Sequence, residues 1–234
     1  MKHVSILLMS AAALCACHSD DAMESMPDAA EAGPQWTSLF DGATFEHWKG
    51  YGQDTMPAGW VVDDGAMFAS EPGQGMDLIS RAPFTSFEFE FDWKVKEAGN
   101  SGVMWHVDES AGSYPWMTGP EYQLLDDGAH NDGAVSKNSA ASNYDVYTPS
   151  KAMTNPAGEW NEARIVVDGA HVEHWLNGEM VVTYEKGSDD WTTRVAGSKW
   201  ATMESYGSTS TGHLAIQGDH GAVWFRNLRI RELN

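Results

Sequence analysis

The sequence has few basic side chains: 14 Lys and Arg stand against 34 Asp and Glu in 234 residues, a formal net charge of −20. No basic surface is therefore available to collect phosphates, which argues against nucleic acid or an anionic membrane surface as a partner. The first 35 residues hold one Lys and five acids, a net −4. Most of the negative charge thus belongs to the remainder of the chain.

Cysteine is also scarce, because Cys15 and Cys17 are the only two. Residues 1–16 begin with Lys2 and an apolar run that is too short to span a bilayer, which is typical of a signal peptide. A small residue before Cys17, with Leu14 three positions before it, is similar to a bacterial lipobox. This pattern predicts a lipid on Cys17 and removal of Cys15; the alternative is an ordinary secreted protein with a stray Cys pair.

On the lipoprotein interpretation no cysteine remains for a disulfide, a thiolate metal site or a nucleophile. The chain is then expected in the bacterial cell envelope, on the periplasmic side or at the cell surface, and held to a membrane by its lipid alone. Residues 17–35 are acidic and rich in small residues, so they predict a flexible tether. Residues 36–234 are left as one domain, long enough to bury a core without disulfides.

What the sequence does have is tryptophan, eleven in all, and short segments with a period of two. Residues 86–96 alternate strictly between apolar and polar side chains, which predicts a half-buried antiparallel strand. Further runs at residues 164–168, 171–176 and 179–185 are separated by Gly169-Ala170 and Asn177-Gly178, and Asn-Gly is a strong hairpin signal.

Three more strand segments complete the pattern. Residues 60–70 predict another hairpin, and residues 212–217 and 222–233 a final pair of strands. A short helix is expected only within residues 188–201. Many short strands joined by Gly and Asn turns favour an all-β sandwich of two antiparallel sheets.

Two sets of carboxylates could act on a sugar. Glu88, Glu90 and Asp92 share one strand face, as in jelly-roll retaining glycosidases, but their spacing is not that of those enzymes and favours a solvated outer face. Glu121 and Gln123 share one face of residues 121–126, where a carboxylate and an amide together suit a cleft that binds hydroxyl groups.

Histidine and aspartate offer further chemistry. His220 stands in a glycine-flanked turn after Gln217, where it could act as an acid, a base or a ligand. No His pair has the spacing of a helical zinc site. Asp126, Asp127 and Asp132 offer oxygen ligands to a hard cation without the regular spacing of an EF-hand. The sequence therefore requires no cofactor and leaves a divalent cation open.

Nine short segments taken together resemble a known family. They include Leu39-Phe40-Asp41-Gly42, Asn100-Ser101-Gly102-Val103, residues 119–126, His174-Trp175-Leu176-Asn177-Gly178, Ser198-Lys199-Trp200 and residues 212–217 with the following His220-Gly221. Their order and their residues are similar to those of the 3-keto-disaccharide hydrolase domain family over residues 36–234. One departure is Gly218-Asp219 before His220, where a shorter turn is expected.

The resemblance implies a concanavalin A-like jelly roll in a secreted lipoprotein that acts on a small carbohydrate oxidised at C3. A ketone at C3 acidifies the hydrogen on C2, so a base can form the enolate and expel the C1 substituent, after which water adds back. Such a site needs a base, an acid, and a cation or donors on the C3 oxygen.

The residues then fall into expected roles. Glu121 and His220 are the base and acid candidates, and Lys199 or Arg226 would stabilise the enolate oxygen. Hydroxyl-binding and stacking roles are expected for Gln123, Gln217, Asn100, Trp105 and Trp116. Two other functions stay open: a non-catalytic carbohydrate-binding lipoprotein, and a retaining jelly-roll glycosidase. The metal, if any, and the oligomeric state are left undetermined.

Overall fold

The computed structural model describes Met1, residues 34–70 and residues 76–233. Gly33–Asn234 forms one compact unit. The predicted signal peptide (apart from Met1), the predicted lipid attachment site at Cys17 and most of the predicted tether lie outside the described residues.

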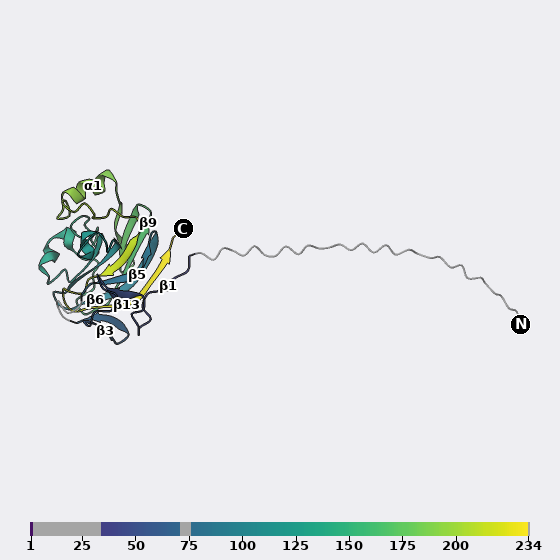
Figure 1. Ribbon diagram of the computed structural model, residues 1–234. Coiled ribbons are helices and arrows are strands. Elements are labelled where there is room, and N and C mark those ends of the chain that lie inside the picture. The colour runs from purple at the N-terminus through teal and green to yellow at the C-terminus, as the bar shows by residue number, and fades with distance from the viewer. Residues whose placement is uncertain (2–33, 71–75, 234) are drawn as a thin grey trace. The chain divides into compact units, whose positions relative to one another are not determined.

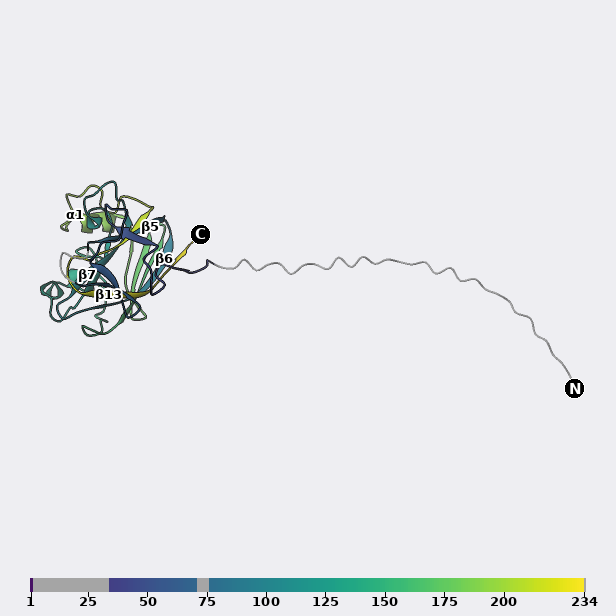
Figure 2. The ribbon, with the colours of Figure 1, turned by 60° about the horizontal axis from the view of Figure 1, so that its bottom comes forward.

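Two antiparallel sheets make up this unit (Figures 1 and 2). The larger sheet orders seven strands as β11–β10–β9–β6–β13–β4–β3, and β1 pairs with β13. Its strands are β1 (Thr37–Ser38), β3 (Trp60–Asp63), β4 (Ala66–Ala69), β6 (Phe87–Val95), β9 (Asn161–Asp168), β10 (His171–Leu176), β11 (Glu179–Glu185) and β13 (Val223–Glu232).

The smaller sheet orders five strands as β2–β5–β12–β7–β8. They are β2 (Trp48–Gly50), β5 (Leu78–Phe84), β7 (Asn100–Val107), β8 (Glu121–Leu125) and β12 (Gly212–Ile216). The helical elements are α1 (Asp189–Ala196) and three 3₁₀ turns, η1 (Pro115–Met117), η2 (Asn131–Ala134) and η3 (Ser136–Asn138). The all-β sandwich expected from the sequence is confirmed.

The strand with the cleanest alternation, β6, lies near the middle of the larger sheet between β9 and β13. Its aromatic side chains Phe87, Phe89, Phe91 and Trp93 are almost completely buried in the core between the sheets. Alternation places these side chains on one face and the polar residues on the other. The Asn177-Gly178 turn joins β10 to β11 with positive φ at both residues, as its sequence predicted.

The acidic residues of β6 are on the outer face, where they pair with arginines of β13. Cross-strand register joins Glu88 to Arg231, Glu90 to Arg229 and Asp92 to Arg226, and each pair is an ion pair. These carboxylates are therefore part of a charge ladder rather than a free pair flanking a glycosidic bond. They lie on the outer face, as the sequence favoured, but the ion pairs cover them, and the Glu88 side chain is only 8% exposed.

The outer face of the smaller sheet carries a second apolar cluster of Tyr51, Ile79, Met104, Val107 and Ala215. Trp116, in η1, packs against this cluster from the loop that follows β7. The Tyr51 hydroxyl donates to the Gly112 carbonyl at 2.8 Å and ties that loop to the sheet. Part of this outer face is thus covered, which sets the rim of the site described below.

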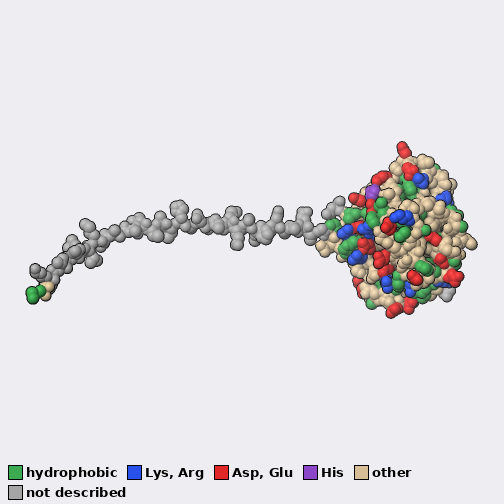
Figure 3. All heavy atoms as spheres, turned by 180° about the vertical axis from the view of Figure 1, so that it is seen from behind, with side chains coloured by type: hydrophobic (Ala, Val, Ile, Leu, Met, Phe, Trp, Pro, Cys, Tyr) green, Lys and Arg blue, Asp and Glu red, His purple; other side chains and the backbone are tan. Residues whose placement is uncertain are grey.

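The surface mixes charges of both signs: Lys and Arg side chains lie among Asp and Glu on the face seen in Figure 3. Within residues 34–70 and 76–233, no helix is both long and apolar enough to cross a membrane.

The buried aromatic row of β6 predicts a large effect of truncation. Phe89→Ala should lower the free energy of unfolding by about 3–5 kcal/mol, because the side chain has no exposed surface and leaves a cavity between the sheets. Urea unfolding followed by tryptophan fluorescence measures the change. Val166→Ala, on the outer face of β9, is the control and should cost about 1 kcal/mol or less; equal losses in the two variants would contradict this account of the core.

Candidate active site

Glu121 opens β8, and the alternation of that strand directs it to the outer face of the smaller sheet. Tyr122 and Leu124 point into the core, so Glu121 and Gln123 share the opposite face. Strand β7 lies alongside with Gly102 opposite Gln123. A Cβ atom at Gly102 would overlap the carboxylate of Glu121, so a side chain here would displace Glu121. This close approach is the physical reason for glycine at position 102.

The other edge of β8 pairs with residues 141–144. The Tyr144 N–H donates to the Glu121 carbonyl at 3.0 Å, and the Gln123 N–H donates to the Ser142 carbonyl at 3.2 Å. Both edges of β8 are therefore covered, and Glu121 is only 5% exposed.

The same segment fixes Lys199 beside Glu121. The Lys199 N–H donates to the Asp145 carboxylate at 2.6 Å, and the Trp200 indole donates to the Tyr144 carbonyl at 3.0 Å. The Lys199 ammonium lies 3.8 Å from the centre of the Tyr144 ring and 4.3 Å from that of Trp200. Two aromatic rings thus hold the cation, and its charge acts on the Glu121 carboxyl, whose pKa it lowers.

His220 is held in a turn that follows β12. The Gln217 N–H donates to the Gly102 carbonyl at 2.9 Å, and the Gly218 N–H donates to the Asp77 carboxylate at 3.1 Å. The imidazole of His220 is bound to the carboxylate of the neighbouring Asp219 and is partly exposed. Gly218 and Asp219 therefore supply an anchor and a partner for His220.

These groups shift one another's protonation. Burial raises the pKa of Glu121 from 4.5 to about 7, opposed by the positive charges of Lys199 and His220. Burial, together with the negative charge of Asp219, raises the pKa of Asp77 to about 6. The hydrogen bond to Asp219 raises the pKa of His220, and loss of hydration lowers the pKa of Lys199. Glu121 can consequently gain or lose a proton near neutral pH.

Asp77 is a member of this cluster that the sequence reasoning missed. It lies directly before β5, is 8% exposed, and is coupled to Glu121, His220 and Asp219. Because side chains alternate along an extended segment, Asp77 points to the same outer face as Ile79, two residues later. In a sequence with many acids, one Asp before a strand does not stand out as a site residue. The charged groups that act on it lie far away along the chain, so no local pattern reveals them.

The predicted hydroxyl-binding residues assemble next to Glu121. The Gln123 side chain lies 3.2 Å from a carboxylate oxygen of Glu121 and 3.2 Å from the amide of Asn100. Gln217 follows β12 and is buried, and its backbone carbonyl accepts from the Ser101 hydroxyl at 2.8 Å. The register of three neighbouring strands thus brings together one carboxylate and three side-chain amides.

Trp116 lies at the rim of the site in an aromatic stack. Its ring is 5.4 Å from that of Tyr114, with the planes at 9°, and 5.9 Å from that of Trp200. Trp116 is partly buried and Tyr114 is 53% exposed. This stack offers an aromatic surface adjoining Lys199.

Two sequence predictions are corrected by their positions. Trp105 has no exposed surface and packs in the core between the sheets, because it lies on the inward face of β7; it cannot provide a face for a sugar. Arg226 belongs to β13 of the other sheet, where it binds Asp92 at 2.9 Å and stacks on Trp160. Lys199 is therefore the cation that is coupled to Glu121.

Among the described residues, no group of three or more His, Asp or Glu side chains is arranged to hold a metal ion. The acids after β8 have other partners: Asp126 accepts from the Ala98 N–H, Asp127 from the Ala140 N–H, and Asp132 from the Tyr144 hydroxyl.

Solved structures with the same architecture identify the class of protein. A crystal structure of a Parabacteroides distasonis protein, inferred to be a glycosyl hydrolase, matches with a TM-score of 0.78 and 34% identity, covering 85% of this chain and 94% of that one. A second from the same organism matches with a TM-score of 0.66 and 23% identity over 85% of this chain, and supports the fold alone. The chain is thus a jelly-roll β-sandwich of the kind found among glycosyl hydrolases.

The family follows from the sequence matches. The profile of the 3-keto-alpha-glucoside-1,2-lyase-like domain matches residues 35–231. The 3-keto-disaccharide hydrolase of Bacteroides thetaiotaomicron is 33% identical over an alignment of 229 positions, and the match covers 85% of this chain and 79% of the relative. The chain therefore belongs to this family, and the resemblance noted in the sequence is confirmed. Family and relative together support an enzyme that cleaves glycosides.

The raised pKa of Glu121 predicts a pH-dependent cost to stability. Because its folded-state pKa of about 7 lies above the ordinary 4.5, the favourable contribution of protonated Glu121 is complete below about pH 4.5 and is lost as the pH rises through 7. Glu121→Gln should therefore match the parent protein near pH 4 and exceed it by roughly 2 to 3 kcal/mol at pH 8. Urea unfolding of both proteins at the two pH values measures this, and a difference independent of pH would contradict it.

Proposed function

We propose that this protein cleaves 3-keto-glycosides or 3-keto-disaccharides by elimination followed by addition of water, with hydrolysis as the net result. One observation carries the proposal: on the outer face of the smaller sheet, a buried carboxyl has a pKa of about 7 and is electrostatically coupled to an ammonium and an imidazole. Proton transfer from carbon is best served by a base whose pKa is near the working pH.

The proposed first step uses Glu121 as the base. Its carboxylate removes the hydrogen on C2, and the electron pair left on that carbon moves toward C3 to give an enolate. The Lys199 ammonium, which is held over two aromatic rings, stabilises the negative charge on the C3 oxygen. A fixed cation in a partly dehydrated site stabilises such charge more strongly than water does.

The second step expels the C1 substituent. The electron pair of the enolate forms the C1–C2 double bond as the C1–O bond breaks, and protonated His220 supplies the proton to the leaving oxygen. Asp219 favours this charged form of the imidazole because its hydrogen bond raises the pKa of His220. Water then adds across the double bond: its oxygen binds C1 and gives up one proton to neutral His220, and the proton held by Glu121 returns to C2.

The remaining side chains bind the sugar in this proposal. Gln123, Asn100 and Gln217 offer both donors and acceptors to hydroxyl groups, and the ring of Trp116 provides a flat apolar surface at the rim. A retaining glycosidase would instead need two free carboxylates flanking the bond, and the acids of β6 are engaged with arginines.

For its location we propose the bacterial cell envelope, with a lipid on Cys17 as the only membrane attachment. The pattern Leu14-Cys15-Ala16-Cys17 supports this proposal, and mass spectrometry of the mature N-terminus tests it.

The reaction is tested with a matched pair of substrates, a 3-keto-glucoside and its parent glucoside. The protein should release the aglycone from the keto form alone, because only that ketone acidifies the hydrogen on C2. Glu121→Gln and His220→Ala should each lower kcat by about 10²- to 10⁴-fold. Glu185→Gln, an exposed acid of β11, is the control and should retain full activity. Cleavage of the parent glucoside, or near-normal rates in both variants, would overturn the mechanism.

A second test separates the two candidate cations. Lys199→Met should lower kcat by about 10²- to 10³-fold, since it removes the charge that stabilises the enolate. Arg226→Met, in the other sheet, should leave turnover of the same 3-keto-glucoside unchanged. The reverse order of effects would show that the enolate is stabilised elsewhere.

A further inference from the structure

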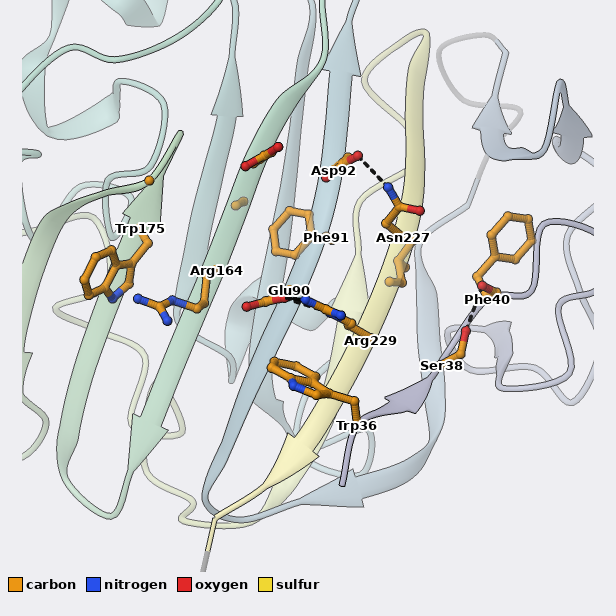
Figure 4. A pocket seen from close by; sticks show the side chains of 14 residues that line it. Trp36, Ser38, Phe40, Glu90, Phe91, Asp92, Arg164, Trp175, Asn227 and Arg229 are labelled. Atoms are coloured by element: carbon orange, nitrogen blue, oxygen red, sulfur yellow. Dashed lines mark hydrogen bonds and ion pairs between the residues drawn. The ribbon is translucent and has the colours of Figure 1, made fainter. Parts of the chain in front are cut away.

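A hollow of about 850 Å³ lies on the outer face of the larger sheet, on the side of the sandwich opposite Glu121 (Figure 4). Trp175 stands at one end, the ring of Trp36 lies nearer the middle beside Glu90 and Arg229, and polar side chains lie between the two rings. We call it the Trp36–Trp175 groove. Its volume lies within the usual range for sites that bind small molecules.

Strand register aligns the groove across five neighbouring strands. Trp175 of β10 pairs with Arg164 of β9, which pairs with Glu90 of β6; Glu90 pairs with Arg229 of β13, which pairs with Ser38 of β1. Four steps between strands at about 4.8 Å each make the row about 19 Å long. A row of this length accommodates a short chain of sugar rings more readily than one ring.

The two indole rings are held in place by arginines. The Arg164 guanidinium lies 3.9 Å from the centre of the Trp175 ring, and that of Arg229 lies 4.6 Å from that of Trp36. The Trp175 indole N–H also donates to Glu173 at 2.7 Å. Both rings remain partly exposed. Rigid, partly exposed tryptophans suit ligands that have one apolar face and a polar edge.

The charges of the groove favour a neutral ligand. Its lining holds three acids, Glu90, Asp92 and Glu162, against the two arginines. Glu90 accepts from Arg229 at 2.8 Å, and Asp92 accepts from the Asn227 amide at 2.7 Å. The Glu162 carboxylate is exposed and has no partner among the described residues, which leaves it able to accept hydrogen bonds from hydroxyl groups.

We propose that the Trp36–Trp175 groove is a second carbohydrate site, which binds a neutral, unoxidised oligosaccharide without cleaving it. The tryptophans stack on the apolar faces of its rings, and the carboxylates, guanidiniums and Asn227 bind its hydroxyl groups. This proposal does not depend on the chemistry proposed for Glu121, because the two sites lie on different sheets.

The test measures oligosaccharide binding to the full-length protein by isothermal titration calorimetry. The probes are cellotetraose, maltotetraose and laminaritetraose, and the Glu121→Gln variant is used so that no turnover contributes heat. At least one probe should bind with a Kd of about 1 mM or lower. Trp175→Ala and Trp36→Ala, each made in that variant, should weaken binding about tenfold or more. Trp224→Ala is the matched control, since this tryptophan stacks on Phe68 outside the groove.

Several outcomes would overturn the proposal. One is that none of the three probes binds at millimolar concentration; another is that binding survives both tryptophan substitutions, which would assign the sugar to the other sheet. A concentration-dependent dimer that Trp175→Ala abolishes, seen by light scattering, would make the groove a contact between copies. If a tryptophan variant does not fold, Glu162→Gln replaces it, and at least a threefold loss of affinity is then expected.

Discussion

The burial of one carboxylate, that of Glu121, is the constraint on which the arrangement of the site depends. A carboxyl group removed from water is costly to ionise, so the surrounding structure has to offset that cost with charge and hydrogen bonds. Strand β7 supplies the space through Gly102, and residues 141–144 cover the other edge of β8. Lys199 and His220 supply the positive charge that keeps the ionised form accessible near neutral pH.

This constraint explains why the cluster is assembled from segments far apart in the sequence. Asp145 positions the backbone of Lys199, Asp77 positions the backbone of Gly218, and Asp219 binds His220. Each of these acids holds a neighbouring segment in place and also adds negative charge near the site. The same arrangement carries a cost in stability, as is common where a site is organised for chemistry rather than for folding.

The two sheets use the same alternation for different purposes. In the larger sheet, the outward positions form a ladder of paired charges, and the rings of Trp36 and Trp175 flank part of it. In the smaller sheet, the outward positions include a buried acid, amides and an apolar cluster. Pairing lowers the net charge of one face, whereas burial on the other produces groups with shifted pKa values.

The sequence by itself determined the strands within residues 60–70, 86–96, 164–185 and 212–233, the hairpin at Asn177-Gly178, the shared face of Glu121 and Gln123, and the family, because these follow from local alternation, turn chemistry and short motifs. It did not predict β2, β5 or β7 of the smaller sheet. Only the tertiary structure decided which side chains meet. It places Trp105 in the core and Arg226 in the other sheet. Which sheet a residue belongs to, and whether its side chain points inward or outward, depends on pairing between strands far apart in the sequence. The tertiary structure also added Asp77, because burial and coupling to distant charges leave no mark on the residues beside it.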